Sequence, residues 1–208
     1  MRLIGMLDSP YVRRTAIALD ELGVPFTHEA VSVFSTFEQF RAINPVVKAP
    51  TLVCDDGEVL MDSSLILQFV ESVAGRSLWP QDPAGRQHDV RAVALALAAC
   101  DKSVQLVYER NLRPKEAQYE PWLQRVAGQI AAAFAALETE VARRPSAFAV
   151  ESRHATITSA VAWQFAQSML AATVPAAQHP QLARLSARME ATATFRKYPP
   201  DGPGVPPV

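Results

Sequence analysis

The feature that most constrains the fold is a change in pattern near residue 75. Before this point, short apolar runs typical of strands alternate with amphipathic segments typical of helices, whereas every later strong pattern has helical spacing. The first part predicts the order β-α-β-α-β-β-α, which requires a mixed sheet with helices packed against it. We therefore expect a small α/β domain followed by an all-helical domain.

The first 75 residues contain clear start and stop signals. Asp55-Asp56-Gly57 predicts a hairpin turn, and Gly23 and Gly75 mark the ends of the first and third helices. The predicted strands are 3–6, 26–31, 51–53 and 59–61, and the predicted helices are 10–22, 34–43 and 65–73.

Residues 76–87 (RSLWPQDPAGRQ) contain two prolines and a glycine and are predicted to be a linker. The helical domain is then expected over 88–208. Its four apolar stripes predict helices near 90–108, 122–141, 157–169 and 182–189. From Tyr198 the chain reads YPPDGPGVPPV, which cannot be helical and is expected to form an exposed tail.

Composition narrows the function classes. The chain has 208 residues, of which 49% are hydrophobic and 20% charged, and its formal net charge is −1. Its lysines and arginines are scattered, which argues against a dedicated nucleic-acid surface. No apolar run is long enough to span a bilayer, and the N-terminus does not fit a signal peptide. The expected location is therefore the cytoplasm.

The metal-ligating and redox-active residue types are sparse. The two cysteines, Cys54 and Cys100, give neither a disulfide framework nor a metal cluster. The histidines have no metal-ligand spacing and are expected to be surface residues or satisfied core residues; they are His28, His88, His154 and His179. We therefore expect no metal site.

Ser9 and Pro10 lie between the first predicted strand and the first predicted helix. Serine at an N-cap followed by proline at the first helical position is an ordinary helix start. The same arrangement also directs a hydroxyl and free backbone N–H groups toward an anion. This stretch alone does not choose between the structural and the functional interpretation.

Three motifs, taken in order, resemble the cytosolic glutathione S-transferase family, especially its bacterial members with a serine in the first motif. They are SPYVRR at 9–14, NPVVKAPTL at 44–52 and DSSLIL at 62–67. The resemblance implies a thioredoxin-like domain over 1–75 that binds glutathione as co-substrate, a C-terminal helical bundle and a homodimer. It also implies a cytoplasmic detoxification transferase. The resemblance covers the whole first domain, whereas the helical half is similar only in length and texture.

Ser9 is the catalytic residue that the resemblance implies. The thiol of glutathione has a pKa of about 8.5, so only a small fraction of the thiol is ionised at neutral pH. Lowering that pKa by about two units requires roughly 2.7 kcal/mol. A hydrogen bond from Ser9 Oγ to the sulfur anion would supply roughly 1.5–3 kcal/mol, and the helix N-terminus about 0.3–1 kcal/mol. With the other two motifs present, the functional interpretation of Ser9 is favoured over a plain N-cap.

The other two motifs supply candidate glutathione contacts. The resemblance implies a cis bond before Pro50, which would let the Ala49 backbone pair with glutathione as an added strand does. Lys48 could bind the glycine carboxylate of glutathione. Alternatively, it is simply a solvated lysine in a loop. Ser63 fits the N-cap of the third helix and could hold the γ-glutamyl carboxylate, while Asp62 could pair with the ammonium. The alternative is that Asp-Ser is an ordinary helix start.

A hydrophobic co-substrate would need a pocket, which the family places between its two domains. The candidate lining residues are Tyr11, Val104, Tyr108 and Trp163. Aromatic residues at helical spacing are more often core residues, so packing is the competing explanation.

Two other functions compete with the transferase hypothesis. Thioredoxin-fold oxidoreductases carry C-x-x-C where this chain has Ser9-Pro10-Tyr11-Val12, so a mechanism through a protein cysteine at this position is excluded. Reduction of a disulfide or peroxide by glutathione itself stays open. So does a non-enzymatic scaffold that binds a protein partner, because fold does not fix function.

Overall fold

The computed structural model describes residues 1–205. These residues form two compact units, which are considered separately. The N-terminal unit is Met1–Leu78 together with Thr192–Pro203, and the helical unit is Trp79–Ala191 together with the described end of the chain from Gly204.

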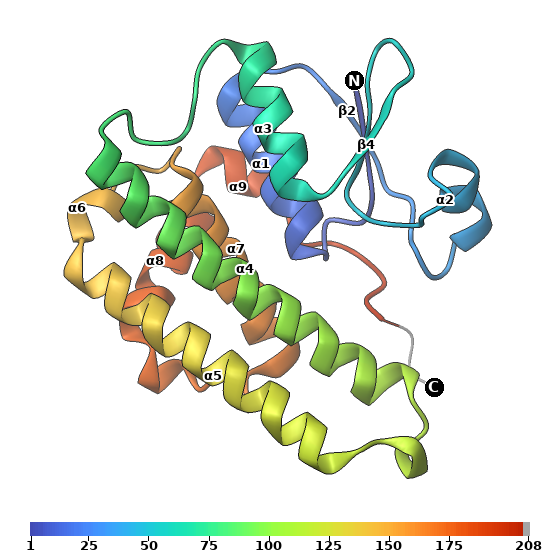
Figure 1. Ribbon diagram of the computed structural model, residues 1–208, viewed down its shortest axis with the longest axis vertical. Coiled ribbons are helices and arrows are strands. Elements are labelled where there is room, and N and C mark those ends of the chain that lie inside the picture. The colour runs from blue at the N-terminus through green and yellow to red at the C-terminus, as the bar shows by residue number, and fades with distance from the viewer. Residues whose placement is uncertain (206–208) are drawn as a thin grey trace. The chain divides into compact units, whose positions relative to one another are not determined.

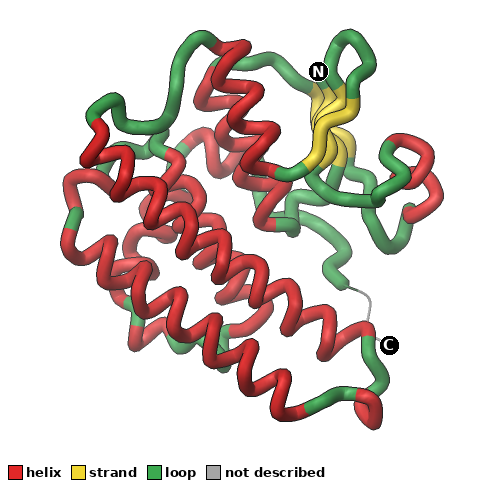
Figure 2. Tube along the Cα trace, viewed as in Figure 1, coloured by secondary structure: helices red, strands yellow, loops and turns green. Residues whose placement is uncertain are grey.

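The N-terminal unit is built on a mixed sheet, drawn in yellow in Figure 2. Within the described residues its strand order is β2-β1-β3-β4. The strands are β1 (Arg2–Ile4), β2 (Thr27–Glu29), β3 (Thr51–Val53) and β4 (Val59–Met61). β1 is parallel to β2 and antiparallel to β3, and β3 is antiparallel to β4. This topology confirms the predicted thioredoxin-like order of elements.

Helices cover both faces of this sheet. α1 (Pro10–Leu22) and α3 (Ser63–Ala74) pack side by side, as Figure 1 shows. On the other face, Phe40 of α2 (Phe37–Ile43) packs with Ile4 and Val31. Strand β1 is therefore buried on both faces, which explains why its residues Leu3-Ile4 are both apolar.

The helical unit contains the four long helices that the stripes predict. They are α4 (Pro83–Leu112), α5 (Glu120–Arg143), α7 (His154–Leu170) and α8 (Pro180–Glu190), with the short α6 (Pro145–Phe148) and single 3₁₀ turns at Lys115–Ala117 and Ala176–Gln178. α4 packs against α5 and α7, and α7 packs against α8. Alanines at the contacts, such as the fully buried Ala96 and Ala160, permit this close approach.

The helical part begins earlier than predicted. Asp82 is the N-cap of α4, where its carboxylate accepts a hydrogen bond from Gly85 N at 2.6 Å, and Pro83 takes the first helical position. Proline is favoured at that position because its missing N–H would be unpaired there in any case. Pro83 and Gly85 of the predicted linker therefore belong to the first turn of α4.

The prediction of an exposed tail from Tyr198 is wrong for Tyr198 itself, whereas Pro199, Asp201, Gly202 and Pro203 are exposed and non-helical as predicted; residues 206–208 of the predicted tail lie outside the described residues. A short helix, α9 (Ala193–Lys197), precedes Tyr198, which is only 7% exposed and stacks on Phe26 with ring centroids 5.8 Å apart. Arg13 Nε donates to the Tyr198 carbonyl at 2.8 Å, and Asp8 N donates to the Asp201 carbonyl at 3.1 Å. The segment thus packs onto α1 as part of the N-terminal unit, where its Tyr198 carbonyl provides the partner that the buried Arg13 guanidinium requires.

Candidate glutathione site at one edge of the sheet

Strand register brings the three motifs to one edge of the sheet. Thr51, the first residue of β3, pairs with Ile4 at the end of β1 and with Met61 at the end of β4. The segment after β1, the segment before β3 and the segment after β4 therefore join the sheet at neighbouring positions. Each of these segments carries one motif, so their residues can act together.

Ser9 is the N-cap of α1. Its backbone is extended, Pro10 occupies the first helical position, and Ser9 Oγ accepts a long hydrogen bond of 3.5 Å from Val12 N. A hydroxyl has one proton to donate in addition to its acceptor lone pairs. Capping uses a lone pair and leaves the proton for another acceptor, so the structural and functional interpretations of Ser9 are compatible.

The Ala49–Pro50 peptide bond is cis, as the resemblance implies. Asn44, which is buried, shapes the loop before it: Nδ2 donates to Thr51 Oγ1 at 2.8 Å, and Oδ1 accepts from Val46 N at 3.0 Å. Thr51 Oγ1 in turn donates to the Lys48 carbonyl at 2.7 Å. These bonds fix the loop from both ends and so fix the position of the Ala49 backbone.

Gly5 is required where this loop meets α1. Its φ is +138°, and a Cβ at this position would lie 2.6 Å from Val12 Cγ2 and 3.2 Å from Ala49 Cβ. A side chain here would push apart the first helical turn and the cis-proline loop. The glycine therefore holds Ala49 next to the residues that follow Ser9, and sequence reasoning did not single it out.

The start of α3 differs from the prediction in one respect. The N-cap is Asp62 and not Ser63, because the Asp62 carboxylate accepts from Ser64 N at 2.9 Å and Leu65 N at 3.4 Å. Its second oxygen lies 3.6 Å from Lys48 Nζ, and both side chains are largely exposed. Lys48 and Asp62, which were predicted to bind opposite ends of glutathione, thus form an ion pair with each other. Ser63 becomes the first helical residue and is buried.

Arg14, like Gly5, is a site residue that the sequence analysis did not single out. It lies on α1 and is 3% exposed, yet its Nη1 donates to Ser63 Oγ at 3.0 Å and to Ser64 Oγ at 3.2 Å. A permanent positive charge therefore lies beside the N-terminus of α3, where the helix dipole is also positive.

The candidate pocket residues have different environments. Tyr11 is half-buried on α1, and on α4 Val104 is half-buried while Tyr108 is exposed. Trp163 is 3% exposed and packs edge-on against Phe134, with ring centroids 5.7 Å apart. Trp163 is therefore a core side chain of the helical unit and does not line an open pocket.

Neither cysteine lies at this edge of the sheet. Cys54 follows the opposite end of β3, and burial, together with the charges of Asp56 and Asp55, raises the pKa of its thiol. Cys100 is buried within α4. A thiol with a raised pKa is a poor nucleophile at neutral pH. Neither thiol is therefore placed to act at this end of the sheet.

Neither a metal-binding cluster nor a membrane-spanning helix occurs in the described residues. Within residues 1–205, no cluster of three histidine, cysteine or acidic side chains could hold a metal ion. In the same residues, no helix has both the length and the apolar character that crossing a membrane requires.

Comparison with known proteins identifies the family. Residues 3–77 match the family model of the glutathione S-transferase N-terminal domain. A glutathione transferase family member from Pseudomonas fluorescens Pf-5, crystallised with bound glutathione, is 30% identical, and its comparison covers 100% of this chain and 99% of that chain with a TM-score of 0.81. The chain belongs to the glutathione S-transferase family.

Two further proteins show the range of similarity. A glutathione S-transferase from Methylobacterium radiotolerans, in complex with glutathione sulfonate, is 29% identical with a TM-score of 0.83, over 100% of this chain and 95% of that chain. The uncharacterized GST-like protein YibF from Escherichia coli (strain K12) is 31% identical over 126 residues, which is 60% of this chain. The match spans 62% of the length of YibF.

Proposed function

We propose that this protein is a glutathione transferase in which Ser9 donates a hydrogen bond to the thiolate of bound glutathione. The thiolate would then attack an electrophilic carbon of a hydrophobic co-substrate. The observation that carries the proposal is the placement of Ser9 at the N-cap of α1, with its hydroxyl proton not needed for capping. The hydroxyl and the helix N-terminus both favour the anionic form of the sulfur, and favouring the anion lowers the thiol pKa.

The cis-proline loop supports a backbone contact to glutathione. No hydrogen bond within residues 1–205 occupies the N–H or C=O of Ala49. An extended tripeptide could pair with these groups in the way that a peptide adds to a sheet edge. Because Asn44 and Gly5 fix this loop, little conformational entropy would be lost when the tripeptide binds.

The start of α3 supports recognition of the γ-glutamyl end. Ser63 and Ser64 carry hydroxyls, each with a proton to donate, beside the Arg14 guanidinium, and these groups together would hold a carboxylate. The free oxygen of Asp62 would take the γ-glutamyl ammonium, and Lys48 would turn from Asp62 to the glycine carboxylate. The exposed pair between them is weak enough to exchange partners, since such pairs contribute about 0–1 kcal/mol.

A homodimer in the cytoplasm completes the proposal. α3 has an exposed apolar row on one face, made of Leu65, Phe69 and Val73 at successive turns. Such a row on a surface helix is typical of a protein–protein contact. Tyr11, Val104 and Tyr108 remain the proposed contacts of the hydrophobic co-substrate.

Titration with glutathione tests the binding step. Calorimetry is expected to show saturable heat for one glutathione per chain, and a scaffold of the same fold would show none. Turnover of an aromatic halide should exceed reduction of a small mixed disulfide, because the site offers an anion-stabilising hydroxyl and no protein thiol. The reverse ratio would assign the protein to the glutathione-dependent reductases.

Asp62 provides a test that separates helix capping from ligand binding. Asp62→Ala should lose about 1–3 kcal/mol of stability, since alanine cannot cap α3 and does not tolerate the φ of +73° at this position. Asp62→Asn keeps the cap and should stay within about 0.5 kcal/mol of the wild type. It should nonetheless bind glutathione roughly fivefold more weakly, because the ammonium loses an ionic partner. Unchanged affinity in Asp62→Asn would remove Asp62 from the binding site.

A further inference from the structure

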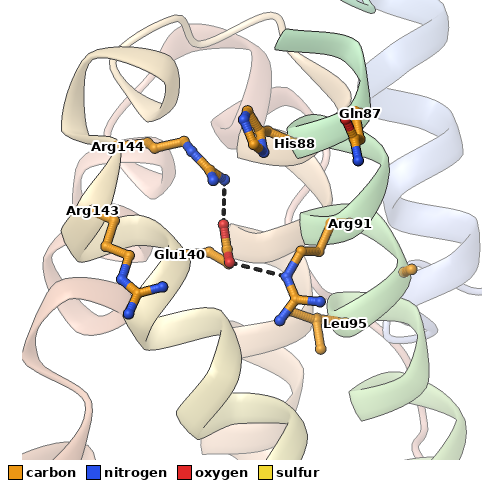
Figure 3. Close-up of a pocket in the computed structure, with 8 residues that line it drawn as sticks. Gln87, His88, Arg91, Leu95, Glu140, Arg143 and Arg144 are labelled. Carbon is orange, nitrogen blue, oxygen red and sulfur yellow. Dashed lines mark hydrogen bonds and ion pairs between the residues drawn. The ribbon is translucent and has the colours of Figure 1, made fainter. Parts of the chain in front are cut away.

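The helical unit contains a pocket that the proposed glutathione chemistry does not use. Its volume is about 720 Å³, and it lies between the N-terminal half of α4 and the C-terminal end of α5 (Figure 3). It is lined by Gln87, His88, Arg91, Ala94 and Leu95 of α4, and by Glu140, Arg143 and Arg144 of α5. Every lining residue belongs to the helical unit, whereas Ser9 and the other proposed glutathione contacts lie in the N-terminal unit.

Glu140 is the centre of the charged groups in this pocket. Its side chain is 5% exposed and accepts hydrogen bonds from Arg91 Nε at 3.0 Å and from Arg144 Nη1. Burial alone would raise the pKa of the Glu140 carboxyl, but the Arg91 hydrogen bond and the Arg144 charge outweigh it and hold the pKa below its usual range. Glu140 is therefore ionised at neutral pH and contributes one negative charge.

Positive charge exceeds negative charge around Glu140. Three arginines line the pocket with this single carboxylate, and Figure 3 shows their guanidinium groups on both sides of it. The nearby Asp89 does not change the balance, because its Oδ1 lies 3.6 Å from Arg153 Nη1. The lining therefore has two more arginines than carboxylates, before any charge on His88.

Of the three arginines that line the pocket, Arg143 is the one that makes no ion pair with Glu140. Among residues 1–205, no hydrogen-bond acceptor or carboxylate pairs with its guanidinium. Arg91 and Arg144 each commit one nitrogen to Glu140 and keep further N–H groups directed to solvent or to the pocket. Arginine forks match the geometry of tetrahedral oxyanions, and the match is strongest where several of them converge.

We propose that this pocket is a binding site for a doubly charged phosphate group, either inorganic phosphate or a small phosphate monoester. The excess of two positive charges would neutralise the dianion, and the Gln87 amide and the His88 ring add further donors. The volume falls in the range of small-molecule sites, so it could accept a monoester with a few additional atoms. Ala94 and Leu95 provide an aliphatic wall for such a substituent.

Calorimetric titration of the whole protein with inorganic phosphate, at constant ionic strength, tests the proposal. Saturable binding is expected for the wild type. Arg143→Gln should weaken it by about tenfold, since it removes one charge-assisted contact and leaves the Glu140 pairs in place. Arg143→Lys should give an intermediate affinity, because it keeps the charge and loses the fork. Repeating the titration with glycerol phosphate distinguishes the sources, since only a monoester site would bind it more tightly than the free ion.

Arg125→Gln is the matched control. Arg125 is also an exposed arginine of α5, but it does not line the pocket. The Arg125→Gln variant removes the same net charge as Arg143→Gln but leaves the pocket unchanged. Its phosphate affinity should therefore equal that of the wild type. Absence of saturable heat in the wild type, or equal weakening in both variants, would overturn the proposal. The proposal would also be overturned if the wild type bound no phosphate and Arg143→Gln changed its self-association. The pocket would then bind an acidic side chain of a second copy of the chain.

Discussion

Replacing Ser9 with alanine is expected to lower turnover of a model electrophile about ten- to a hundredfold near neutral pH, while glutathione affinity changes little. The variant loses a hydrogen bond to a sulfur anion, which is worth roughly 1.5–3 kcal/mol. Affinity is preserved because Ser9 contacts only the sulfur in our proposal, whereas other groups bind the tripeptide backbone and its ends. Steady-state kinetics with an aromatic halide and calorimetry with glutathione measure the two effects.

The pH profile distinguishes loss of the anion-stabilising hydroxyl from general damage. Without the hydroxyl the pKa of the bound thiol rises, so activity should recover as the pH passes the free thiol value of about 8.5. Ser9→Thr keeps a hydroxyl and a helix cap, and should retain most of the turnover at neutral pH. Ser9→Gly costs only a few tenths of a kcal/mol as a cap but has no hydroxyl, so it should behave as alanine does. A uniform loss at every pH would contradict the proposed role.

Local pattern was enough to predict the order of the elements in residues 1–75. The helix from Pro10 to Leu22 and the hairpin around Asp55-Asp56-Gly57 have the predicted bounds, because capping and turn chemistry depend on neighbours in sequence. The N-cap of α3 was misplaced by one residue, since Asp62 and Ser63 can both cap a helix. Only the actual backbone, with Asp62 at a φ of +73°, decides between them.

Long-range partners explain what sequence pattern could not give. The segment around Tyr198 is rich in proline and glycine, and nothing in its own composition reveals that Arg13 Nε donates to the Tyr198 carbonyl. The bond between Arg14 and Ser63 joins residues 49 positions apart. From the sequence, both arginines counted only among the scattered basic residues of the chain. Each is instead a buried donor whose acceptor lies in a distant part of the chain.

Arg14→Met is expected to impair both stability and glutathione binding. Methionine fills a similar volume but cannot donate to Ser63 and Ser64, so stability should fall by about 1–3 kcal/mol in urea unfolding. The γ-glutamyl carboxylate would also lose its positive partner, which should raise the KM for glutathione at least about tenfold. Because Arg14 does not contact the sulfur in our proposal, kcat at saturating glutathione should change little.

Two further variants separate the electrostatic role of Arg14 from its packing role. Arg14→Lys keeps a positive charge and should restore part of the glutathione affinity, although a single ammonium cannot reproduce the guanidinium geometry. Arg2→Met removes an exposed arginine of the same unit, which pairs with Glu29, and should change stability by less than about 1 kcal/mol. If Arg14→Met bound glutathione as tightly as Arg2→Met does, Arg14 would act only in joining α1 to α3. The positive charge beside the α3 N-terminus would then have no part in recognising the tripeptide.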